Sequence, residues 1–289
     1  MAARCVTSQP CIACGAERWA AHYRELVRCD ACGFVRAADL PSAEALAALY
    51  GAAYFEGEEY ADYLGDRDVH RFNFRRRLGR ITSVAGRIAS LYEIGCAYGM
   101  WLELAAQHGI RAAGIDISAS AVQHAREVLK QEASAGAFED ACLAPAEFQS
   151  FCMWDTLEHL AHPDEMVAKI ARLLPSGGWF FATTGDIGSA TARRQGPQWR
   201  MIHPPTHLQY FSRESVARFL ERHGLRTQHI ESEPMCRSLY GTLAGLRRFG
   251  HGAVRVAAQL ATAVPATLTR RVRFTLDLGD IMLVCARKD

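Results

Sequence analysis

The hydrophobic positions of this chain fall into short apolar runs separated by stretches of helical periodicity. Runs of strand length lie at residues 88–94, 111–117, 148–154, 179–183, 225–231 and 280–286, and a weaker one lies at 135–138. Between them apolar residues recur at helical spacing, as at Ala121, Val122, Ala125, Val128 and Leu129. Such strand–helix alternation predicts the α/β class, with a doubly wound, mostly parallel seven-stranded sheet covered by helices on both faces.

Local signals set the ends of several predicted helices. Gly109 suits the position that follows a helix C-terminus, and Ser118 suits an N-cap. Pro163 opens a helix that we expect to run to Leu174, and the turn at 175–178 closes it. These boundaries agree with the positions of the apolar runs.

Residues 41–85 are expected to form a helical linker or cap. Its expected parts are a short helix at 43–50, an aromatic cluster at 54–63 and a longer helix at 68–85. Phe74, Leu78 and Ile81 share one face of the longer helix. Its five arginines fall largely elsewhere: Arg71, Arg75, Arg76, Arg77 and Arg80. We expect a solvated basic face, and contact with an anionic substrate is the alternative.

Four cysteines near the N-terminus form two C-x-x-C-G knuckles, one at Cys11 and Cys14 and the other at Cys29 and Cys32. Four thiolates at this spacing can surround Zn²⁺ tetrahedrally, which leaves no open position for catalysis. We therefore predict a structural zinc ribbon over residues 1–40, in which the metal supplies much of the folding energy. Chance spacing and redox-active pairs are the alternatives.

Composition narrows the classes of protein. The 289 residues carry a formal net charge of only +2, which argues against strong non-specific attraction to nucleic acid. The first residues lack the apolar core of a signal peptide, and no apolar run reaches the ~18 residues that span a bilayer. We expect a cytoplasmic protein whose cysteines are metal ligands or buried thiols rather than disulfides.

The stretch from Glu93 to Gly99, E-I-G-C-A-Y-G, joins an expected strand to a helix through small residues. Small residues let the backbone approach a ligand, and the helix that follows presents free N–H groups. Asp116 ends the next expected strand, where a carboxylate can accept hydrogen bonds from a ribose diol. These features predict a nucleoside pocket. The G-x-G-x-x-G pattern of dinucleotide sites is not met, because Ala97 and Met100 take its second and third positions.

The same stretch resembles the E/D-x-G-x-G-x-G motif of class I S-adenosylmethionine-dependent methyltransferases, with Ala97 replacing the middle glycine. Two later stretches, D-T-L-E-H at 155–159 and L-L-P-S-G-G at 173–178, are similar to further motifs of this family. The segment from Trp199 to Ser212 also resembles this group. The likeness covers about residues 88–231 and the last strand. The chain departs from the family at Gln149. The family often has Phe-Asp at the start of its fourth strand, and this chain has Phe148-Gln149 there.

The resemblance implies S-adenosylmethionine as the cofactor. It implies that the glycine-rich stretch passes under the methionine and ribose parts, that Asp116 holds the ribose hydroxyls and that Ile117 packs on adenine. Asp140, or else Glu139, would accept from the adenine amino group, and Glu93 would lie near the cofactor amine or only orient the turn. The full expected cofactor-binding set is Glu93, Gly95, Cys96, Ala97, Gly99, Asp116, Ile117, Asp140 and Trp154.

Methyl transfer from a sulfonium is an in-line displacement, so the protein mainly aligns the reactants. A hydroxyl acceptor also needs a base, and histidine suits this role near neutral pH. We expect His207 to be the base, with His203 and His159 as the other candidates and Asp155 or Tyr210 in support. A structural hydrogen-bonding role is the alternative for each histidine.

A four-cysteine ribbon ahead of such a core is similar to bacterial enzymes that methylate sugars and polysaccharides. We therefore expect an enzyme that methylates a small-molecule or glycan acceptor, most simply a sugar hydroxyl or carbon. The alternatives are an rRNA or tRNA methyltransferase, disfavoured by the near-neutral charge, and a non-catalytic cofactor-binding scaffold.

Residues 86–289 are expected to form the methyltransferase domain, with an insert at about 235–279. The insert combines apolar residues such as Leu239, Leu243 and Leu246 with several arginines, which predicts amphipathic helices. These helices could cover the active site, form a homodimer interface or contact a membrane peripherally.

Overall fold

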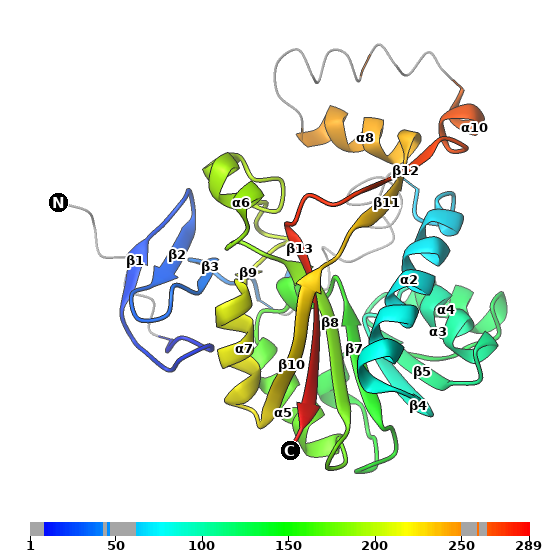
Figure 1. Ribbon diagram of the computed structural model, residues 1–289, viewed down its shortest axis with the longest axis horizontal. Coiled ribbons are helices and arrows are strands. Elements are labelled where there is room, and N and C mark those ends of the chain that lie inside the picture. Colours follow the sequence, from blue (N-terminus) through cyan, green and yellow to red (C-terminus); the bar gives the residue numbers. More distant parts are fainter. Residues whose placement is uncertain (1–8, 43–44, 47–61, 250–258, 260–264) are drawn as a thin grey trace.

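The computed structural model describes residues 9–42, 45–46, 62–249, 259 and 265–289. Its centre is a seven-stranded sheet (Figure 1). The strands are β4 (Ser90–Ile94), β5 (Arg111–Asp116), β6 (Glu132–Ala135), β7 (Ser150–Trp154), β8 (Trp179–Gly185), β10 (Leu225–Ser232) and β13 (Ile281–Lys288). Their order is β10-β13-β8-β7-β4-β5-β6, and β13 runs antiparallel to both of its neighbours while the other pairs are parallel. The predicted doubly wound, mostly parallel sheet is confirmed.

The strand order reverses at the centre of this sheet. β4 pairs in parallel with β5 on one side and with β7 on the other. Open α/β sheets bind ligands in the crevice outside the carboxyl ends of the strands at such a reversal. The candidate residues that follow β4 and β7 therefore lie at the position where this architecture holds ligands.

Helices cover both faces of the sheet (Figure 1). One face packs against α2 (Arg67–Ala85), α3 (Met100–Gln107) and α4 (Ala119–Glu127), and the other packs against α5 (Pro163–Leu173) and α7 (Arg213–Glu221). Alternate residues of the central strands supply the two cores: in β4, Leu91 joins the first, whereas Tyr92 and Ile94 join the second. This is why the strands read as continuous apolar runs in the sequence.

Most predicted strand ends lie within two residues of the observed ones. The weak strand predicted at 135–138 is wrong in position, since β6 spans Glu132–Ala135. Gly136, at φ 143°, ends β6, and its N–H donates to the Asp116 carbonyl at 2.9 Å. The next residues, Phe138–Asp140, form a 3₁₀ turn instead. The start of β7 at Ser150 shows that the Phe148-Gln149 pair lies just ahead of its strand.

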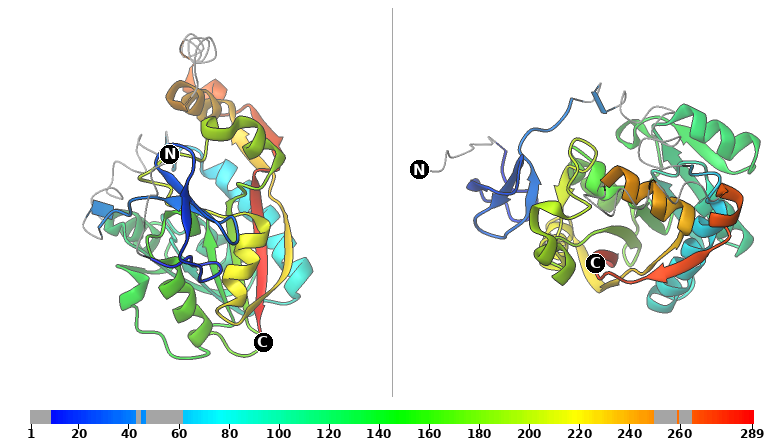
Figure 2. Two further views of the ribbon diagram at one scale, coloured as in Figure 1. Left: turned by 90° about the vertical axis from the view of Figure 1, so that its left-hand side faces the viewer. Right: turned by 90° about the horizontal axis from the view of Figure 1, so that it is seen from above.

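The N-terminal cysteine region forms a small antiparallel sheet beside the main one. Its strands are β1 (Trp19–Ala21), β2 (Leu26–Cys29) and β3 (Val35–Ala37), and a fourth, β9 (Gln209–Tyr210), comes from the distant segment before α7. In Figure 2 this region stands at one side of the molecule. The Phe34 ring lies 5.0 Å from the Phe211 ring, between ring centroids, so the apolar cores of the two parts are continuous.

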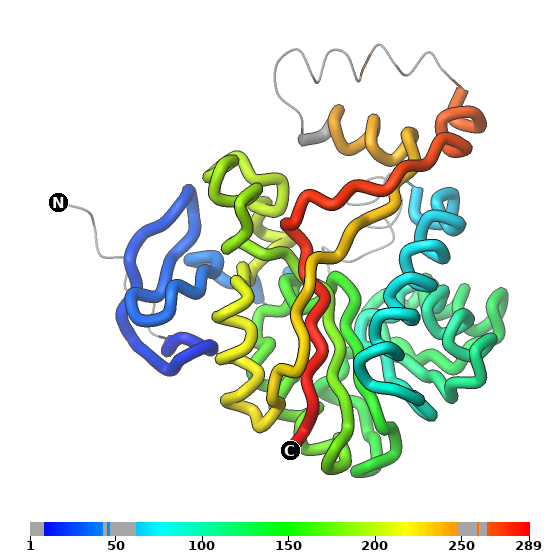
Figure 3. Tube along the Cα trace, viewed as in Figure 1, coloured from blue at the N-terminus to red at the C-terminus, as the bar shows by residue number. Residues whose placement is uncertain are grey.

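The insert at 235–279 begins and ends with strands. β11 (Met235–Ser238) pairs antiparallel with β12 (Arg273–Leu276), and α8 (Leu239–Phe249) and α10 (Ala266–Thr269) lie between them in the chain. The prediction of helices alone is therefore incomplete. Figure 3 shows the trace rising from β10 into β11 and returning through β12 to β13. The Asn73 side chain on α2 makes two hydrogen bonds to the Cys236 backbone, of 2.8 and 3.0 Å, which hold the strand pair against α2.

The solvated basic face predicted for α2 is wrong for Arg77 and holds for the exposed Arg75. Arg77 is 1% exposed, and its guanidinium pairs with Asp155 at 2.9 Å and with Glu233 at 3.4 Å. Arg80 pairs with Glu233 at 2.6 Å, and Arg71 pairs with Glu103 at 2.5 Å. Long-range partners neutralise these charges, and a helix considered alone cannot show them.

Some expectations fall outside the described residues. The predicted helix at 43–50 is described only at residues 45–46, which are helical, and most of the aromatic cluster at 54–63 is not described. Within the described residues, no helix is long and apolar enough to cross a membrane. Shorter elements complete the fold: α6 (Ala190–Gln195) and 3₁₀ turns at Leu157–His159 and Gly196–Gln198.

Candidate functional site

The loop between β4 and α3 takes a conformation that few residues other than glycine adopt. Gly95, Ala97 and Gly99 have φ values of 79°, 44° and 76°. A Cβ on Gly95 would lie 2.5 Å from the Thr156 hydroxyl, so this glycine lets the β4 loop pass close to the turn after β7. Ala97 carries a left-handed backbone with a Cβ, which costs roughly 1–2 kcal/mol. The expected departure from the glycine motif is thus accommodated, although with strain.

Asp116 ties this loop to the end of β5. Its carboxylate accepts hydrogen bonds from the Ala97 N–H and the Ser118 N–H, both at 2.8 Å. The side chain is largely buried, and burial raises the pKa of this carboxyl while the two N–H groups lower it. Each carboxylate oxygen keeps a further acceptor site for a ligand. The next residue, Ile117, is 49% exposed and offers an apolar surface beside that position.

We expect Asp116→Asn to weaken the binding of S-adenosylhomocysteine by roughly 10- to 100-fold. The amide lacks the charge and directs an N–H₂ group at a backbone N–H, and hydrogen bonds to charged groups contribute roughly 1.5–3 kcal/mol. Isothermal titration calorimetry measures the change. Glu132→Gln, at an exposed residue of neighbouring β6, is the control. An unchanged affinity in Asp116→Asn would remove Asp116 from the pocket.

A cavity lies at the carboxyl ends of β4 and β7. Its lining comes from α2, β4, α3, β7 and β11: Tyr63, His70, Asn73, Phe74, Arg77, Glu93, Gly95, Cys96, Met100, Trp101, Trp154, Asp155 and Met235. Four expected cofactor-binding residues, Glu93, Gly95, Cys96 and Trp154, thus meet here with Asp155, which was expected to support the base. Three buried polar atoms of the lining have no hydrogen-bond partner among the described residues: Glu93 Oε2, Trp101 Nε1 and Trp154 Nε1. Buried polar atoms without partners are rare, so the cavity fits a ligand that is itself polar.

Charges of both signs border this cavity. Burial and the nearby Asp116 raise the pKa of Glu93 well above its usual value, and Arg77 opposes them. Burial also acts to raise the pKa of Asp155, but the ion pair with Arg77 outweighs it and holds that pKa below the usual value. The cavity is thus lined by two carboxyl groups and by one guanidinium that already pairs with Asp155.

Sequence reasoning missed Arg77 as a cavity residue. A signal was present, because Phe74, Arg77, Leu78 and Ile81 stand at i, i+3, i+4 and i+7. Arg77 therefore occupies a core position of an apolar stripe, and a charge at such a position is kept only where it has partners.

Three histidines gather beside the end of β7. The rings of His159 and His207 lie 4.6 Å apart and those of His203 and His207 lie 3.8 Å apart, between centroids. His207 Nδ1 lies 2.9 Å from the Met201 carbonyl, and His159 Nδ1 lies 2.8 Å from the Thr206 carbonyl. A carbonyl only accepts, so in each ring Nδ1 carries the proton. The neutral form of His207 therefore presents Nε2 as its basic atom.

Burial keeps the imidazoles of His159 and His207 neutral. It lowers the pKa of His159 to about 4 and that of His207 well below the usual value, with His159 and His203 adding to the latter shift. The expected supporting residues contact other groups: the Tyr210 hydroxyl donates to the His207 carbonyl at 2.9 Å, and Asp155 accepts from the Thr183 hydroxyl at 2.9 Å. Glu139 and Asp140 are exposed on the 3₁₀ turn after β6.

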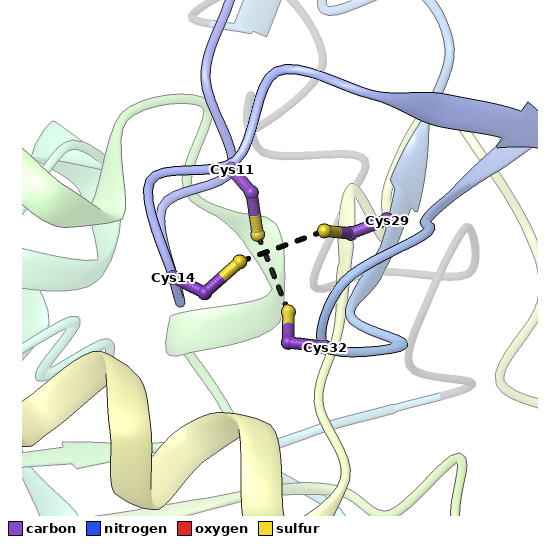
Figure 4. A group of neighbouring side chains, drawn as sticks. All are labelled: Cys11, Cys14, Cys29 and Cys32. Carbon is purple, nitrogen blue, oxygen red and sulfur yellow. Dashed lines mark hydrogen bonds between the residues drawn. The ribbon is translucent and has the colours of Figure 1, made fainter.

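Two side-chain groups have the donor sets of metal sites. The sulfur atoms of Cys11, Cys14, Cys29 and Cys32 all lie within 4.8 Å of one another (Figure 4). The Cys11–Cys32 and Cys14–Cys29 sulfur pairs are 3.5 and 3.6 Å apart, close to the ~3.8 Å expected for a tetrahedron with ~2.3 Å zinc–sulfur bonds. The cluster therefore fits structural zinc. The second group, Glu158, His159 and His207, brings one donor atom from each residue within 4.8 Å of the others.

Comparisons with known proteins identify the family of the chain. Residues 57–230 match the family described as methyltransferase domain. A ubiquinone biosynthesis O-methyltransferase from Methylococcus capsulatus is 37% identical over 111 residues, which cover 36% of this chain and 45% of that protein. The enzyme of the same name from Thiobacillus denitrificans is 34% identical over 150 residues, covering 48% and 65%. The chain thus spans about half to two thirds of the length of these relatives.

Solved structures support the fold. An S-adenosylmethionine-dependent methyltransferase from Archaeoglobus fulgidus aligns with a TM-score of 0.53 at 16% identity, covering 82% of this chain and 100% of that one. The YcgJ protein from Bacillus subtilis also has a TM-score of 0.53 at 16% identity, covering 74% and 98%. At this identity the likeness concerns the fold alone. The match over 57–230 shows that the chain belongs to the methyltransferase-domain family.

Proposed function

We propose that this protein transfers a methyl group from S-adenosylmethionine to a hydroxyl oxygen of a small molecule. One observation carries the proposal: the loop–Asp116 unit, the polar cavity and the histidine cluster all follow strands of one sheet edge, around β4 and β7. The loop–Asp116 unit and the polar cavity suit the methyl donor. The histidine cluster suits the acceptance of a proton from the hydroxyl. The names of the relatives, which are O-methyltransferases, support oxygen as the methylated atom.

On the donor side, the loop of Gly95, Ala97 and Gly99 would lie under the cofactor, and Asp116 would hold the ribose hydroxyls. Ile117 would cover adenine, with Asp140 or Glu139 at its amino group. Glu93 and Arg77 would face the ammonium and carboxylate at the methionine end, since both line the cavity. Bound S-adenosylmethionine supplies an electrophilic methyl group, and the chain's part is to align the acceptor with it.

On the acceptor side, Nε2 of His207 would take the hydroxyl proton. The backbone carbonyl of Met201 fixes the ring, and burial keeps it neutral and ready to accept. His159 and His203 are the other candidates. The Glu158–His159–His207 group has a donor set that divalent cations use. A cation held there would occupy Nε2 of His207, so this arrangement is an alternative to His207 as the base and not part of the same step.

Two classes of small-molecule acceptor fit the proposal. A sugar hydroxyl, expected from the ribbon arrangement, and a hydroxylated precursor of a quinone, suggested by the names of the relatives, both have a methylatable oxygen. An RNA acceptor is disfavoured by the net charge of +2. A non-catalytic scaffold is disfavoured because the cofactor loop, Asp116 and a neutral histidine are all in place.

The remaining assignments are also proposals. They comprise a structural zinc ribbon at 1–40, a linker or cap at 41–85, the methyltransferase domain at 86–289 and a cytoplasmic location. The insert would cover the donor site, since Met235 of β11 lines the cavity. A homodimer interface and peripheral membrane contact remain predictions for the outer surface of the insert.

A radiolabel assay tests the proposal. The purified full chain is incubated with methyl-labelled S-adenosylmethionine and, separately, with nucleotide sugars, hydroxylated quinone precursors, RNA and protein extract. We expect label in one of the two small-molecule sets and none in RNA or protein. Binding of S-adenosylhomocysteine without transfer to any set would favour the scaffold.

A further inference from the structure

The third strand of the cysteine ribbon contacts the segment that carries the histidines. β3 pairs with β9, which places Val35 opposite Tyr210 and Arg36 opposite Gln209. One residue earlier along this segment, the Leu208 carbonyl accepts from the Ala37 N–H at 2.8 Å. The ribbon sheet is therefore completed by the residues that directly follow His207.

The same segment is bonded on its other side to the turn that carries Glu158 and His159. The Leu208 N–H donates to the Glu158 carbonyl at 2.8 Å, so the peptide groups of Leu208 face the ribbon and the turn in opposite directions. The Gln209 side-chain amide donates to the Leu160 carbonyl at 2.9 Å. Two consecutive residues thus link β3 to the turn after β7.

The two Leu208 bonds are shielded from water, whereas the Gln209–Leu160 bond is partly buried. Leu208 is 0% exposed and Gln209 is 2% exposed, and the adjoining Phe34 and Phe211 rings are buried against each other. A hydrogen bond shielded from water is costly to lose, because neither partner can turn to solvent. By contrast, the cofactor loop is anchored elsewhere: the Gly95 and Cys96 N–H groups donate to the Ile115 carbonyl, at 2.9 and 3.1 Å, on β5.

We propose that the ribbon is a positioning element of the acceptor side. Its strand β3 fixes Leu208 and Gln209, and these residues set the position of the Glu158–His159 turn relative to the His207 ring. The inference rests on the proposed function for the role of the histidines, but the mechanical coupling does not depend on it. The loop that would hold the methyl donor is bonded to β5 and takes no part in the hydrogen bonds of Leu208 and Gln209.

Two variants break the links at different places. Ala37→Pro removes the N–H that bonds to Leu208, and Gln209→Met removes the amide that bonds to Leu160 while keeping a side chain of similar length. We expect each to lower kcat by about 10- to 100-fold, the scale of a small misplacement of reacting groups, with affinity for S-adenosylhomocysteine changed less than about twofold. Ala38→Pro is the matched control, because its N–H bonds to Glu25 within the ribbon region.

Hydrogen–deuterium exchange of the full chain supplies a readout that needs no acceptor. In Ala37→Pro and Gln209→Met, we expect faster exchange in peptides covering 157–161 and 203–211, and unchanged exchange over 94–102. Faster exchange confined to residues 26–42, or a kcat equal to that of the control, would overturn the proposal. Another outcome is the expected faster exchange at 157–161 and 203–211 in the variants while the parent chain methylates no acceptor. In that case the coupling between the ribbon and the histidine segment is supported and the proposed function is contradicted.

Discussion

Replacing His207 by alanine is expected to lower kcat by about 100- to 10,000-fold, the usual contribution of a general base. The ring lies in the histidine cluster, and its Nδ1–H is committed to the Met201 carbonyl, so Nε2 is the atom lost to catalysis. The affinity for S-adenosylhomocysteine should change little, because His207 does not line the cavity at the end of β4. Steady-state kinetics and calorimetry on the same sample separate the two effects.

A second substitution at His207 distinguishes a general base from a residue with a structural role. His207→Asn keeps an amide donor for the Met201 carbonyl but has no basic nitrogen, so it should lose kcat as fully as alanine does. His229→Ala, on the half-exposed β10 strand, is the control for removing a histidine. Near-normal turnover in His207→Asn would reduce His207 to a structural role and direct attention to His159 and His203.

The pH dependence of turnover offers an independent check of the same base. Burial, with His159 and His203, holds the pKa of His207 well below 6.5. A base must be unprotonated, so His207 stays active at any pH above this lowered pKa. We therefore expect kcat to remain level as the pH falls through 6.5. A midpoint near 6.5 would indicate a solvent-exposed histidine as the base.

Replacing Arg77 by methionine is expected to lower the free energy of unfolding by about 3–5 kcal/mol. Its side chain is 2% exposed and its guanidinium lies between Asp155 and Glu233. Its loss leaves the Asp155 carboxylate without its cation, while Glu233 keeps its ion pair with Arg80. Urea unfolding at neutral pH measures the change. Arg75→Met, on the exposed side of the same helix, should stay within ~0.5 kcal/mol of the parent chain.

A double variant tests whether the stability lost in Arg77→Met comes from an unpaired carboxylate. In Arg77→Met/Asp155→Asn, the carboxylate that lost its cation is neutral, so part of the lost stability should return. A loss below ~1 kcal/mol in Arg77→Met would show that the buried pairs are weak. Because Arg77 also lines the cavity, its variant should bind S-adenosylhomocysteine less tightly, whereas Arg75→Met should bind it normally.

The parts of this fold that the sequence predicts are those set by local periodicity. Strands β4, β5, β7 and β8 are mostly apolar on both faces and are separated by segments of helical periodicity, so short windows of sequence determine them. The loop after β4 and the acid at the end of β5 were predictable for the same reason, since a strand, a small-residue turn and a strand-ending acid are contiguous signals. The clustering of the four N-terminal cysteines is predictable from their spacing alone.

The parts that the sequence does not predict depend on partners far along the chain. The two residues of β9 are too few to show a pattern, and they become a strand only because β3 offers an edge. Arg77 looks like one arginine among five until Asp155 and Glu233 meet it. β11 and β12 are separated by more than thirty residues, so their pairing has no local turn signal. Tyr210 was expected beside the His207 ring, whereas its hydroxyl contacts the His207 carbonyl.

The central claim is transfer of a methyl group from S-adenosylmethionine to an oxygen of a small molecule. The most direct measurement uses a donor with a trideuterated methyl group, the full chain, and the acceptor found to take up label, followed by mass spectrometry and NMR of the product. The account predicts a trideuteromethyl ether on one hydroxyl, formed by the parent chain and lost in His207→Asn. A methyl group on carbon or nitrogen, or no product from a chain that binds the cofactor, would contradict it.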